Sequence, residues 1–308
     1  MINYKGRFAP SPSGLLHFGS LIAATASYLE AQVNKGEWII RIEDLDKPRE
    51  VAGASDNILQ TLQAYGFEWN DKIVYQSKRL DVYQSAFDIL KNHNQIYPCA
   101  CSRKEIADSA ICHGIEGLIY PGTCRNDMSK RSIFKLSNHL AYRVEVAQTT
   151  IEFRDCIQGL ITQNLATDIG DFVLKRADGL FAYQLAVVVD DSMQGITHVV
   201  RGADLLDSTP RQIYLLQLLG LPIPRYAHLP IASNYQGEKL SKQNRAQALE
   251  RSNGNKQLWR ALTFLGQFPP NELQFESLET VWGWAKKNWV LQKVPKQRAI
   301  GVYEQDED

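Results

Sequence analysis

Two strand-like runs, each followed by a helix-like run, open the chain and constrain its fold class. Residues 5–9 can form a strand, and the prolines after them cannot extend it because they lack the N–H that a ladder needs. Residues 20–31, rich in Ala and Leu, favour a helix. Residues 37–44 then predict a second strand, and residues 55–65 a second helix. This alternation is typical of a parallel sheet with right-handed crossovers, so we predict an α/β fold of the Rossmann type.

The turn after the first strand has the features of a phosphate-binding site. Ligands of such folds bind beyond the carboxyl ends of the strands, which puts residues 10–19 and the pair Glu43–Asp44 in one crevice. A helix N-terminus presents unpaired N–H groups and partial positive charge, and Gly19 lets a nucleotide approach the backbone. His17 can donate to a phosphate oxygen, although an isolated histidine before a helix is more often structural.

Size and composition narrow the class of protein. The 308 residues suffice for roughly two domains, and 44% hydrophobic with 22% charged residues is ordinary for a globular chain. No stretch approaches the ~20 apolar residues of a membrane span, and residues 1–7 lead into no signal-peptide core. We therefore expect a cytoplasmic protein, a monomer, with no membrane partner. The net charge of zero does not by itself point to a nucleic-acid partner, although a neutral total can hide local basic patches. Two basic regions, residues 239–260 and 286–298, are interpreted as solvated helical surface.

A segment of different texture, residues 99–178, separates the two α/β parts. Alternating runs at 141–146 and 151–153 predict antiparallel strands, so we interpret the segment as an insertion. We predict a catalytic domain in two halves (1–98 and 179–245), the insertion (99–178), and a helical C-terminal region (246–308) that ends in a disordered acidic tail.

Four of the five cysteines lie close together, between residues 99 and 124 of this segment, and an odd total argues against a disulfide framework. Cys-x-Cys at Cys99 and Cys101 with Cys124 indicates zinc moderately, because a structural site takes four ligands. Candidates for the fourth ligand are Tyr120, Cys112 and His113, and chemistry alone favours the latter two. Buried reduced thiols are the alternative. We expect Cys156 to be a buried apolar residue.

The second half predicts further elements. Residues 180–191 resume the α/β texture and lead to Asp190–Asp191 at the end of a strand, where sheet-end solvation or helix capping is favoured over Mg²⁺ binding. A helix at 209–219 and a strand at 228–232 follow, and helices continue to near Gln297. We expect the spacing of Trp282, Trp284 and Trp289 to place them in a core. We expect His93, His139 and His198 at the surface.

Several separated motifs resemble those of one family. Residues 7–20 resemble the opening signature of glutamyl-tRNA synthetases, with His17-Phe18-Gly19-Ser20 in the place of the class I HIGH motif. Residues 41–46 resemble that family's RIED(T/L)D element, and residues 199–205 its VIRG(E/A)D segment. Residues 239–243 resemble the KMSKS loop. Ser20 replaces the second His of HIGH and Gln243 the final Ser of KMSKS, which alters the nucleotide site without removing it.

The resemblance covers roughly residues 1–250 and implies a class I synthetase that binds ATP, Mg²⁺ and L-glutamate. Glu43 suits the substrate ammonium, and Arg7 offers a planar fork for the side-chain carboxylate. For Arg201 the alternative is a surface ion pair with Asp204. The implied catalytic residues are His17 and Lys242. The implied glutamate ligands are Arg7, Phe8, Ala9, Pro10, Ser11, Glu43, Tyr183 and Arg201. The implied ATP ligands are His17, Gly19, Ser20, Lys239 and Lys242.

The cysteine spacing resembles the zinc element of short glutamyl-synthetase-like proteins and implies a structural Zn²⁺ on Cys99, Cys101, Tyr120 and Cys124. About 60 residues follow Arg245, fewer than an anticodon-binding region needs. Together these features imply tRNA-independent glutamate activation and transfer to the queuosine base at the wobble position of tRNA(Asp), with docking on the anticodon stem-loop.

Three alternatives remain for the function. They are a truncated synthetase that charges the tRNA 3′ end, a small-molecule ligase, and a non-enzymatic RNA-binding module. The last would not need Arg7, His17, Glu43, Arg201 and Lys242 together.

Overall fold

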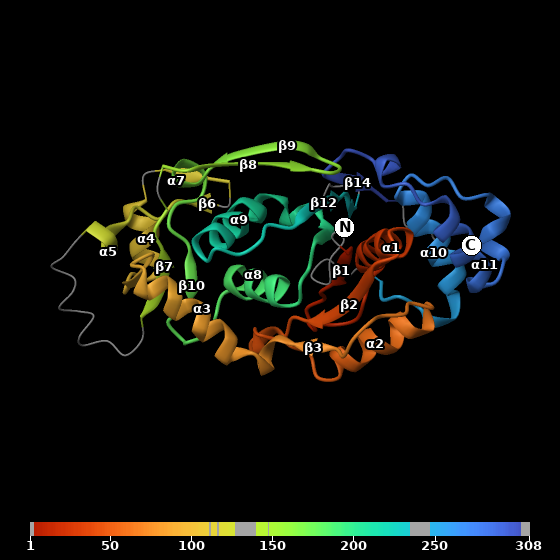
Figure 1. Ribbon diagram of the computed structural model, residues 1–308, viewed down its shortest axis with the longest axis horizontal. Coiled ribbons are helices and arrows are strands. Elements are labelled where there is room, and N and C mark those ends of the chain that lie inside the picture. Colours follow the sequence, from red (N-terminus) through yellow and green to blue (C-terminus); the bar gives the residue numbers. More distant parts are fainter. Residues whose placement is uncertain are drawn as a thin grey trace.

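The computed structural model describes residues 3–110, 112–115, 117–126, 140–146, 148–234 and 247–302. The molecule is elongated, with the inserted segment at one end, the C-terminal helices at the other and the parallel strands between them (Figure 1). Within the described ranges, no helix is both long and apolar enough to span a bilayer.

The N-terminal half is built on parallel strands β1 (Lys5–Phe8), β2 (Glu37–Ile42) and β3 (Val74–Tyr75), in that order. Helices α1 (Phe18–Val33) and α2 (Ala54–Ala64) form the two connections. The predicted strand–helix–strand–helix alternation is therefore confirmed.

The second half supplies strands β11 (His198–Gly202) and β12 (Arg225–Leu229), which pair in parallel. The N–H of Thr197 donates to the carbonyl of Lys5 at 3.0 Å, so β11 runs beside β1. Helices α8 (Tyr183–Met193) and α9 (Thr209–Leu218) pack together in the middle of the molecule (Figure 1).

The segment between the halves is antiparallel, as predicted. Strands β4 (Ile96–Cys99), β7 (Ala141–Val144) and β10 (Val173–Lys175) form one sheet in the order β10-β7-β4. A long hairpin of β8 (Thr150–Asp155) and β9 (Gly159–Asn164) runs along one edge of the molecule toward β12 and β14 (Figure 1).

The remaining elements are short or lie at the C-terminal end. Helices α3 (Leu80–Asn92), α10 (Gly254–Phe264) and α11 (Leu278–Asn288) are the longer ones. The short elements are α4 (Arg103–Ser109), α5 (Thr123–Asn126), α7 (Leu165–Asp168), β5 (His113–Gly114), β6 (Gly117–Leu118), β13 (Ile231–Ser233) and β14 (Ala299–Gly301). The 3-10 helices are η1 (Lys47–Arg49), η2 (Gln76–Lys78), η4 (Ala203–Ser208), η6 (Arg251–Asn253), η7 (Asn271–Phe275) and η8 (Leu291–Lys293).

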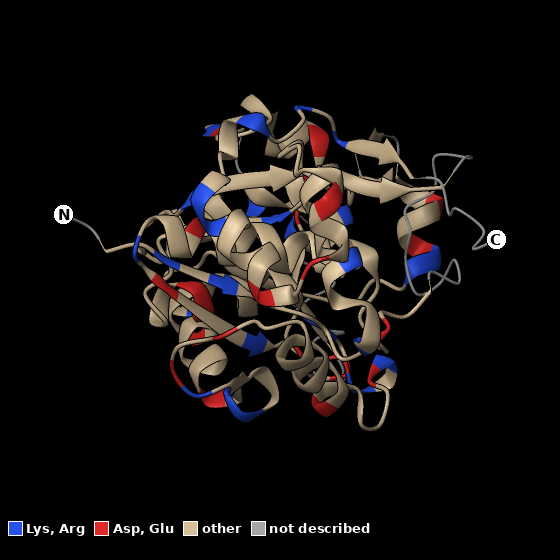
Figure 2. Cartoon of the chain, turned by 90° about the vertical axis from the view of Figure 1, so that its right-hand side faces the viewer, with Lys and Arg blue, Asp and Glu red and all other residues tan. Residues whose placement is uncertain are grey.

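The C-terminal helices share a core with the first parallel strands. Trp282 of α11 is buried against Tyr28 and Phe67, and Trp289 donates its ring N–H to Glu30 at 2.6 Å. Trp284 packs against the same cluster, so the predicted core role of these tryptophans is confirmed. Lysines and acidic residues are interspersed on this face of the molecule, without one dominant sign (Figure 2). The basic residues between 286 and 298 are exposed, as expected of solvated surface.

The sequence-based expectations were wrong at three places. Residues 183–193 form helix α8 rather than a strand, so Asp190 and Asp191 lie inside a buried helix and not at a sheet end. The valine-rich run favours a strand by propensity, but burial in a helical layer overrides that preference. Cys156 is exposed at the hairpin turn rather than buried. His198 is half-buried and stacks on Tyr4 at 4.1 Å.

Beyond the helices that were predicted to near Gln297, the C-terminal region contains β14, which pairs in parallel with β13. His93 is exposed, as expected. His139, the KMSKS-like loop at 239–243 and the acidic tail at 304–308 lie outside the described residues.

Candidate active site

One cavity of about 650 Å³ lies at the carboxyl ends of β1 and β11 and at the start of α1. Its volume is in the range of small-molecule sites. It is lined by every described residue that the sequence assigned to glutamate or ATP, namely Arg7, Phe8, Ala9, Pro10, Ser11, His17, Gly19, Ser20, Glu43, Tyr183 and Arg201. Lys239 and Lys242 belong to the loop outside the described ranges.

The first turn of α1 forms one side of the cavity. His17 is the N-cap in an extended conformation (φ −127°, ψ 176°), and its carbonyl accepts the N–H groups of Ser20 and Leu21 at 2.9 and 3.1 Å. The first turn of this fully described helix contains no acidic residue. Its partial positive charge therefore faces the cavity undiminished, which suits an anionic phosphate chain.

A buried ion-pair network reaches the cavity through Arg7 and Glu43. We call it the Arg7 cluster: Arg7, Arg41, Glu43, Asp190 and Asp191. The guanidinium of Arg7 donates from Nε to Asp191 Oδ1 at 3.1 Å and from Nη2 to Oδ2 at 3.4 Å. Arg41 Nη1 lies 2.8 Å from the same Asp191 Oδ1. Although burial opposes ionisation, these two arginines lower the pKa of Asp191 below its usual value.

The same network fixes Glu43. Arg41 is fully buried, and its Nη2 donates to Glu43 Oε1 at 3.2 Å. Burial raises the pKa of Glu43, against the opposing effect of Arg41 and Arg7. A carboxylate in this position, with a free edge on the cavity, can bind an ammonium group.

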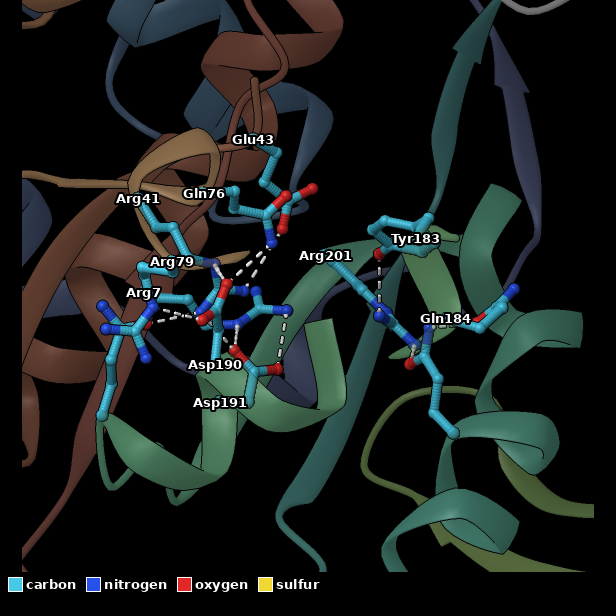
Figure 3. Close-up of polar contacts among 12 residues, drawn as sticks. Arg7, Arg41, Glu43, Gln76, Arg79, Tyr183, Gln184, Asp190, Asp191 and Arg201 are labelled. Atoms are coloured by element: carbon cyan, nitrogen blue, oxygen red, sulfur yellow. Dashed lines mark hydrogen bonds and ion pairs between the residues drawn. The ribbon is translucent and has the colours of Figure 1, made fainter. Parts of the chain in front are cut away.

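Asp190 holds the network on the side away from the cavity, where it is fully buried. Its carboxylate accepts from Arg79 Nε at 2.6 Å and from Gln76 Nε2 at 2.8 Å (Figure 3). The Tyr83 hydroxyl also donates to it, at 2.8 Å. The sequence analysis missed this role for Asp190 and Asp191. Two adjacent acids inside an apolar run were the available signal, because buried carboxylates require cationic partners.

A different set of contacts holds Arg201. We call Tyr183, Arg201, Thr209, Gln212 and His228 the Arg201 cluster. Arg201 Nη2 donates to Gln212 at 2.7 Å and to Thr209 at 2.9 Å, and Nη1 lies 3.5 Å from the Tyr183 hydroxyl. Figure 3 shows Tyr183 and Arg201 apart from the group of arginines and aspartates.

Arg201 is only 5% exposed, so the alternative of a surface ion pair with Asp204 does not hold. Among the described residues, no carboxylate is paired with its guanidinium.

His228 completes the Arg201 cluster, and no motif in the sequence indicated its role. It is fully buried on β12, where Arg201 Nε donates to His228 Nε2 at 3.1 Å. On its other side, His228 Nδ1 lies 2.6 Å from Asp155 Oδ2. Burial lowers the pKa of His228 to about 4, against the raising effect of Asp155, so the imidazole is neutral at pH 7.

The cysteines form a separate cluster in the inserted segment. The thiol sulfurs of Cys99, Cys101 and Cys124 lie within 4.8 Å of one another. The Tyr120 hydroxyl lies 3.5 Å from the sulfurs of both Cys99 and Cys101. Tetrahedral zinc with bonds of ~2.3 Å requires ligand–ligand separations of about 3.8 Å, so these four side chains fit one ion. The exposed Cys112 and His113 are not part of the cluster.

The surroundings of this cluster act differently on its members, because burial raises the pKa of Cys101 to about 11 and that of Tyr120 above its usual range, whereas neighbouring donors act in the opposite direction on Cys124. Arg143 Nε donates to Cys99 Sγ at 3.4 Å, and its guanidinium lies 4.0 Å from the centre of the Tyr120 ring. Burial alone would raise the pKa of Cys124, but hydrogen bonds from Tyr120 and from the backbone of Ala100 lower it. Metal ligands must be deprotonated, and neighbouring donors of this kind support that state.

Comparison with known proteins agrees with this arrangement. Residues 4–268 match the family of class I tRNA synthetases (E and Q), catalytic domain. A glutamyl-Q tRNA(Asp) synthetase from Dechloromonas aromatica is 55% identical over 96% of this chain and 97% of that protein. One from Chromobacterium violaceum is 52% identical over 95% of each.

Solved structures show the same fold. The glutamate-tRNA synthetase of Elizabethkingia anophelis superposes with a TM-score of 0.80 at 24% identity, over 98% of this chain and 68% of that one. A glutamate tRNA ligase from Elizabethkingia meningosepticum, in complex with its amino acid, gives 0.77 at 24% identity, over 96% and 66%. The chain thus spans about two thirds of these synthetases.

These matches define a class I tRNA synthetase catalytic domain. The chain belongs to that family, of the glutamate and glutamine type, and within it to the glutamyl-Q tRNA(Asp) synthetases.

Proposed function

We propose that this protein is an ATP-dependent ligase that activates L-glutamate and transfers it to the queuosine base at the wobble position of tRNA(Asp). The observation that carries the proposal is the single cavity that gathers an anion-binding helix start, two buried arginines and a buried glutamate. The close relatives named glutamyl-Q tRNA(Asp) synthetase support the choice of acceptor over the 3′ end.

In the first step, the α-carboxylate of glutamate attacks the α-phosphorus of ATP, a C–O–P bond forms, and pyrophosphate leaves. Glu43 binds the substrate ammonium, and Arg7 binds its side-chain carboxylate, which selects glutamate over glutamine. Ser11, Tyr183 and Arg201 surround the amino acid. His17 and the N-terminus of α1 bind the phosphates, together with Lys239 and Lys242. Mg²⁺ bound with ATP supplies further charge neutralisation.

In the second step, a hydroxyl of queuosine attacks the acyl carbon, the ester forms, and AMP leaves. We propose that the activation step needs no tRNA. The parallel strands of residues 1–98 and 179–245 form the catalytic domain in this scheme, and residues 99–178 form an inserted domain that Zn²⁺ stabilises through Cys99, Cys101, Tyr120 and Cys124.

The test is transfer of labelled glutamate, with ATP and Mg²⁺, to tRNA(Asp) prepared with and without queuosine. We expect label only on the queuosine-containing tRNA, located in its anticodon fragment. ATP–pyrophosphate exchange with glutamate alone is the companion assay. Label on both tRNAs at the 3′ end would contradict the proposed acceptor, and absence of exchange under all conditions would contradict tRNA-independent activation.

A further inference from the structure

Three buried side chains near the cavity are linked in series by hydrogen bonds, and the first of them belongs to the inserted segment. Asp155 closes strand β8, His228 lies on β12, and Arg201 lies on β11. Asp155 is 2% exposed and His228 is 0% exposed. The β8–β9 hairpin runs across the molecule toward β12 (Figure 1). Asp155 is the last residue of β8, at the end of the hairpin that meets β12.

The proton positions in this chain follow from the donors. Arginine is always protonated, so the Nε–H of Arg201 can only donate, and His228 Nε2 must accept at 3.1 Å. The single proton of the neutral imidazole is then on Nδ1, where it is donated to Asp155 Oδ2 at 2.6 Å. Thr209 Oγ1 accepts from Arg201 and lies 3.1 Å from His228 Nε2 and 3.2 Å from the carbonyl of Leu205, so its one hydroxyl proton can be donated to either of these acceptors.

Backbone hydrogen bonds hold the Asp155 carboxylate in one orientation. Its Oδ1 accepts three backbone N–H groups, from Ile157 and Gln158 at 2.9 Å and from His228 at 3.2 Å. Oδ2 remains for the imidazole. Because the first oxygen is committed to backbone donors, the second must face the ring, and this fixes the tautomer of His228.

We propose that Asp155 and His228 are positioning residues that set the orientation of Arg201 for glutamate. This inference rests on the proposed function. With Nε and Nη2 committed to His228, Thr209 and Gln212, the Nη1 edge of Arg201, beside Tyr183, is the part that can reach a ligand in the cavity. Arg201 thereby keeps its full positive charge for an anionic group of the substrate, because its direct partners are neutral.

Asp155→Asn is the sharpest single test. The three backbone N–H groups require the amide oxygen at the Oδ1 position, which puts the amide NH₂ against His228 Nδ1. Nδ1 must then accept, so the proton moves to Nε2 and opposes the Nε–H of Arg201. We expect the KM for glutamate in ATP–pyrophosphate exchange to rise by about tenfold or more, with the KM for ATP changed by less than about twofold.

Two substitutions of His228 separate its two bonds. His228→Gln can keep an acceptor near the Nε2 position for Arg201, whereas His228→Asn can keep only a donor for Asp155. We expect the asparagine variant to raise the KM for glutamate more than the glutamine variant does. In the His228→Gln background, the further change Asp155→Asn should add less than it does in the wild type, because the tautomer no longer matters.

Gln158→Ala is the matched control, since Gln158 tethers the same hairpin to the carbonyls of His228 and Gln297 without touching Arg201. It should leave the KM for glutamate unchanged. A direct readout is the nitrogen-15 NMR spectrum of His228 at pH 7, which we expect to show the Nδ1–H form in the wild type and the Nε2–H form in Asp155→Asn.

The two possible failures are distinguishable. Absence of exchange by the wild-type protein would overturn the proposed function. Wild-type exchange together with an unchanged glutamate KM in Asp155→Asn, or an Nε2–H tautomer in the wild type, would overturn the positioning role alone. Equal rises in the KM for glutamate and ATP would also overturn it, because they would indicate a general structural effect.

Discussion

Two buried arginines face the same cavity, and their surroundings differ in kind. Arg7 is bound directly by the carboxylate of Asp191, which it shares with Arg41. Arg201 is bound by an imidazole, a hydroxyl and an amide, and its nearest linked carboxylate, Asp155, lies one side chain further away. The charge of Arg7 is partly balanced by Asp191, and Arg7 can offer a ligand only the N–H groups that Asp191 does not use, whereas Arg201 is held by neutral acceptors and has no balancing charge directly beside it.

The difference between the two arginines explains how one cavity can bury several charges stably and still bind an anion. The Arg7 cluster balances the guanidinium groups of Arg7 and Arg41 with the carboxylates of Glu43 and Asp191, which makes burial of so many charges tolerable. The Arg201 cluster uses hydrogen bonds for geometry instead. Four predictions test this contrast, in descending order of expected effect.

Removal of the shared carboxylate should have the largest effect. Asp191→Ala leaves Arg7 and Arg41 without their closest counter-charge in a buried site, and we expect a loss of about 3 to 5 kcal/mol in the free energy of unfolding. Thr209→Val, which removes one neutral acceptor from Arg201, should cost only about 1 to 3 kcal/mol. Urea denaturation of both variants measures this, and equal losses would refute the contrast.

Acidification should weaken the Arg201 cluster first. The unfolded chain protonates His228 near pH 6.5, but the folded chain does so only near pH 4, so the free energy of unfolding falls as the pH drops through this interval. Between pH 7 and pH 5 the loss from this group is about 2 kcal/mol. The pKa of Asp191 is lowered below 3.8, so its contribution is retained in this range and is lost only at lower pH.

The measurement is the difference in unfolding free energy between wild type and His228→Gln at pH 7 and pH 5. Burial raises the pKa of Glu43 in both proteins alike, so the pH dependence that Glu43 contributes cancels in this difference. A difference that does not change with pH would count against a neutral buried His228.

The third prediction concerns the cysteine cluster, where a third arginine, Arg143, donates to Cys99 Sγ. If Cys99, Cys101, Tyr120 and Cys124 bind zinc, Cys101→Ser should lose most of the bound metal and lower the melting temperature by about 5 °C. Cys112→Ser is the control, because Cys112 is exposed and outside the cluster. Metal analysis and thermal unfolding measure both effects. Zinc loss in Cys112→Ser but not in Tyr120→Phe would reassign the fourth ligand.

The smallest effect belongs to an exposed pair on the same strand as Arg7. Lys5 Nζ lies 2.8 Å from Glu37 and 3.1 Å from Asp71, whose side chains are 50% and 62% exposed. Lys5→Gln should cost less than about 1 kcal/mol, and the cost should shrink further in high salt. A cost near that of Asp191→Ala would show that burial is not what separates the two pairs.

The sequence predicted the local parts of this molecule well. Helices α1, α2 and α9 each coincide with a run of helix-forming residues in the sequence. The turn at residues 10–19 contains prolines, which end the preceding strand. The residues assigned to glutamate and ATP were predicted from motifs whose order along the chain is specific, and those that are described line one cavity.

What the sequence did not predict depends on contacts between distant segments. Asp155 and His228 are 73 residues apart, and neither stands in a motif, so only the fold brings them together. Asp190 and Asp191 were assigned to a strand because the three valines before them favour one. The arginines that bind these acids come from distant segments: Arg7 from β1, Arg41 from β2, and Arg79 from the position directly after η2. Strand β14 is short and irregular in pattern, and its pairing with β13 depends on the path of the whole C-terminal region.

The β8–β9 hairpin has a consequence for how this fold can be cut or recombined. Insertions in a catalytic domain are usually treated as modules that can be deleted or exchanged between relatives. Here the hairpin supplies Asp155 to the interior beside β12, so a graft that replaces residues 99–178 also replaces a side chain that holds His228 of the Arg201 cluster. Any minimal domain designed from this chain must therefore retain the hairpin, even where the cysteine cluster is discarded.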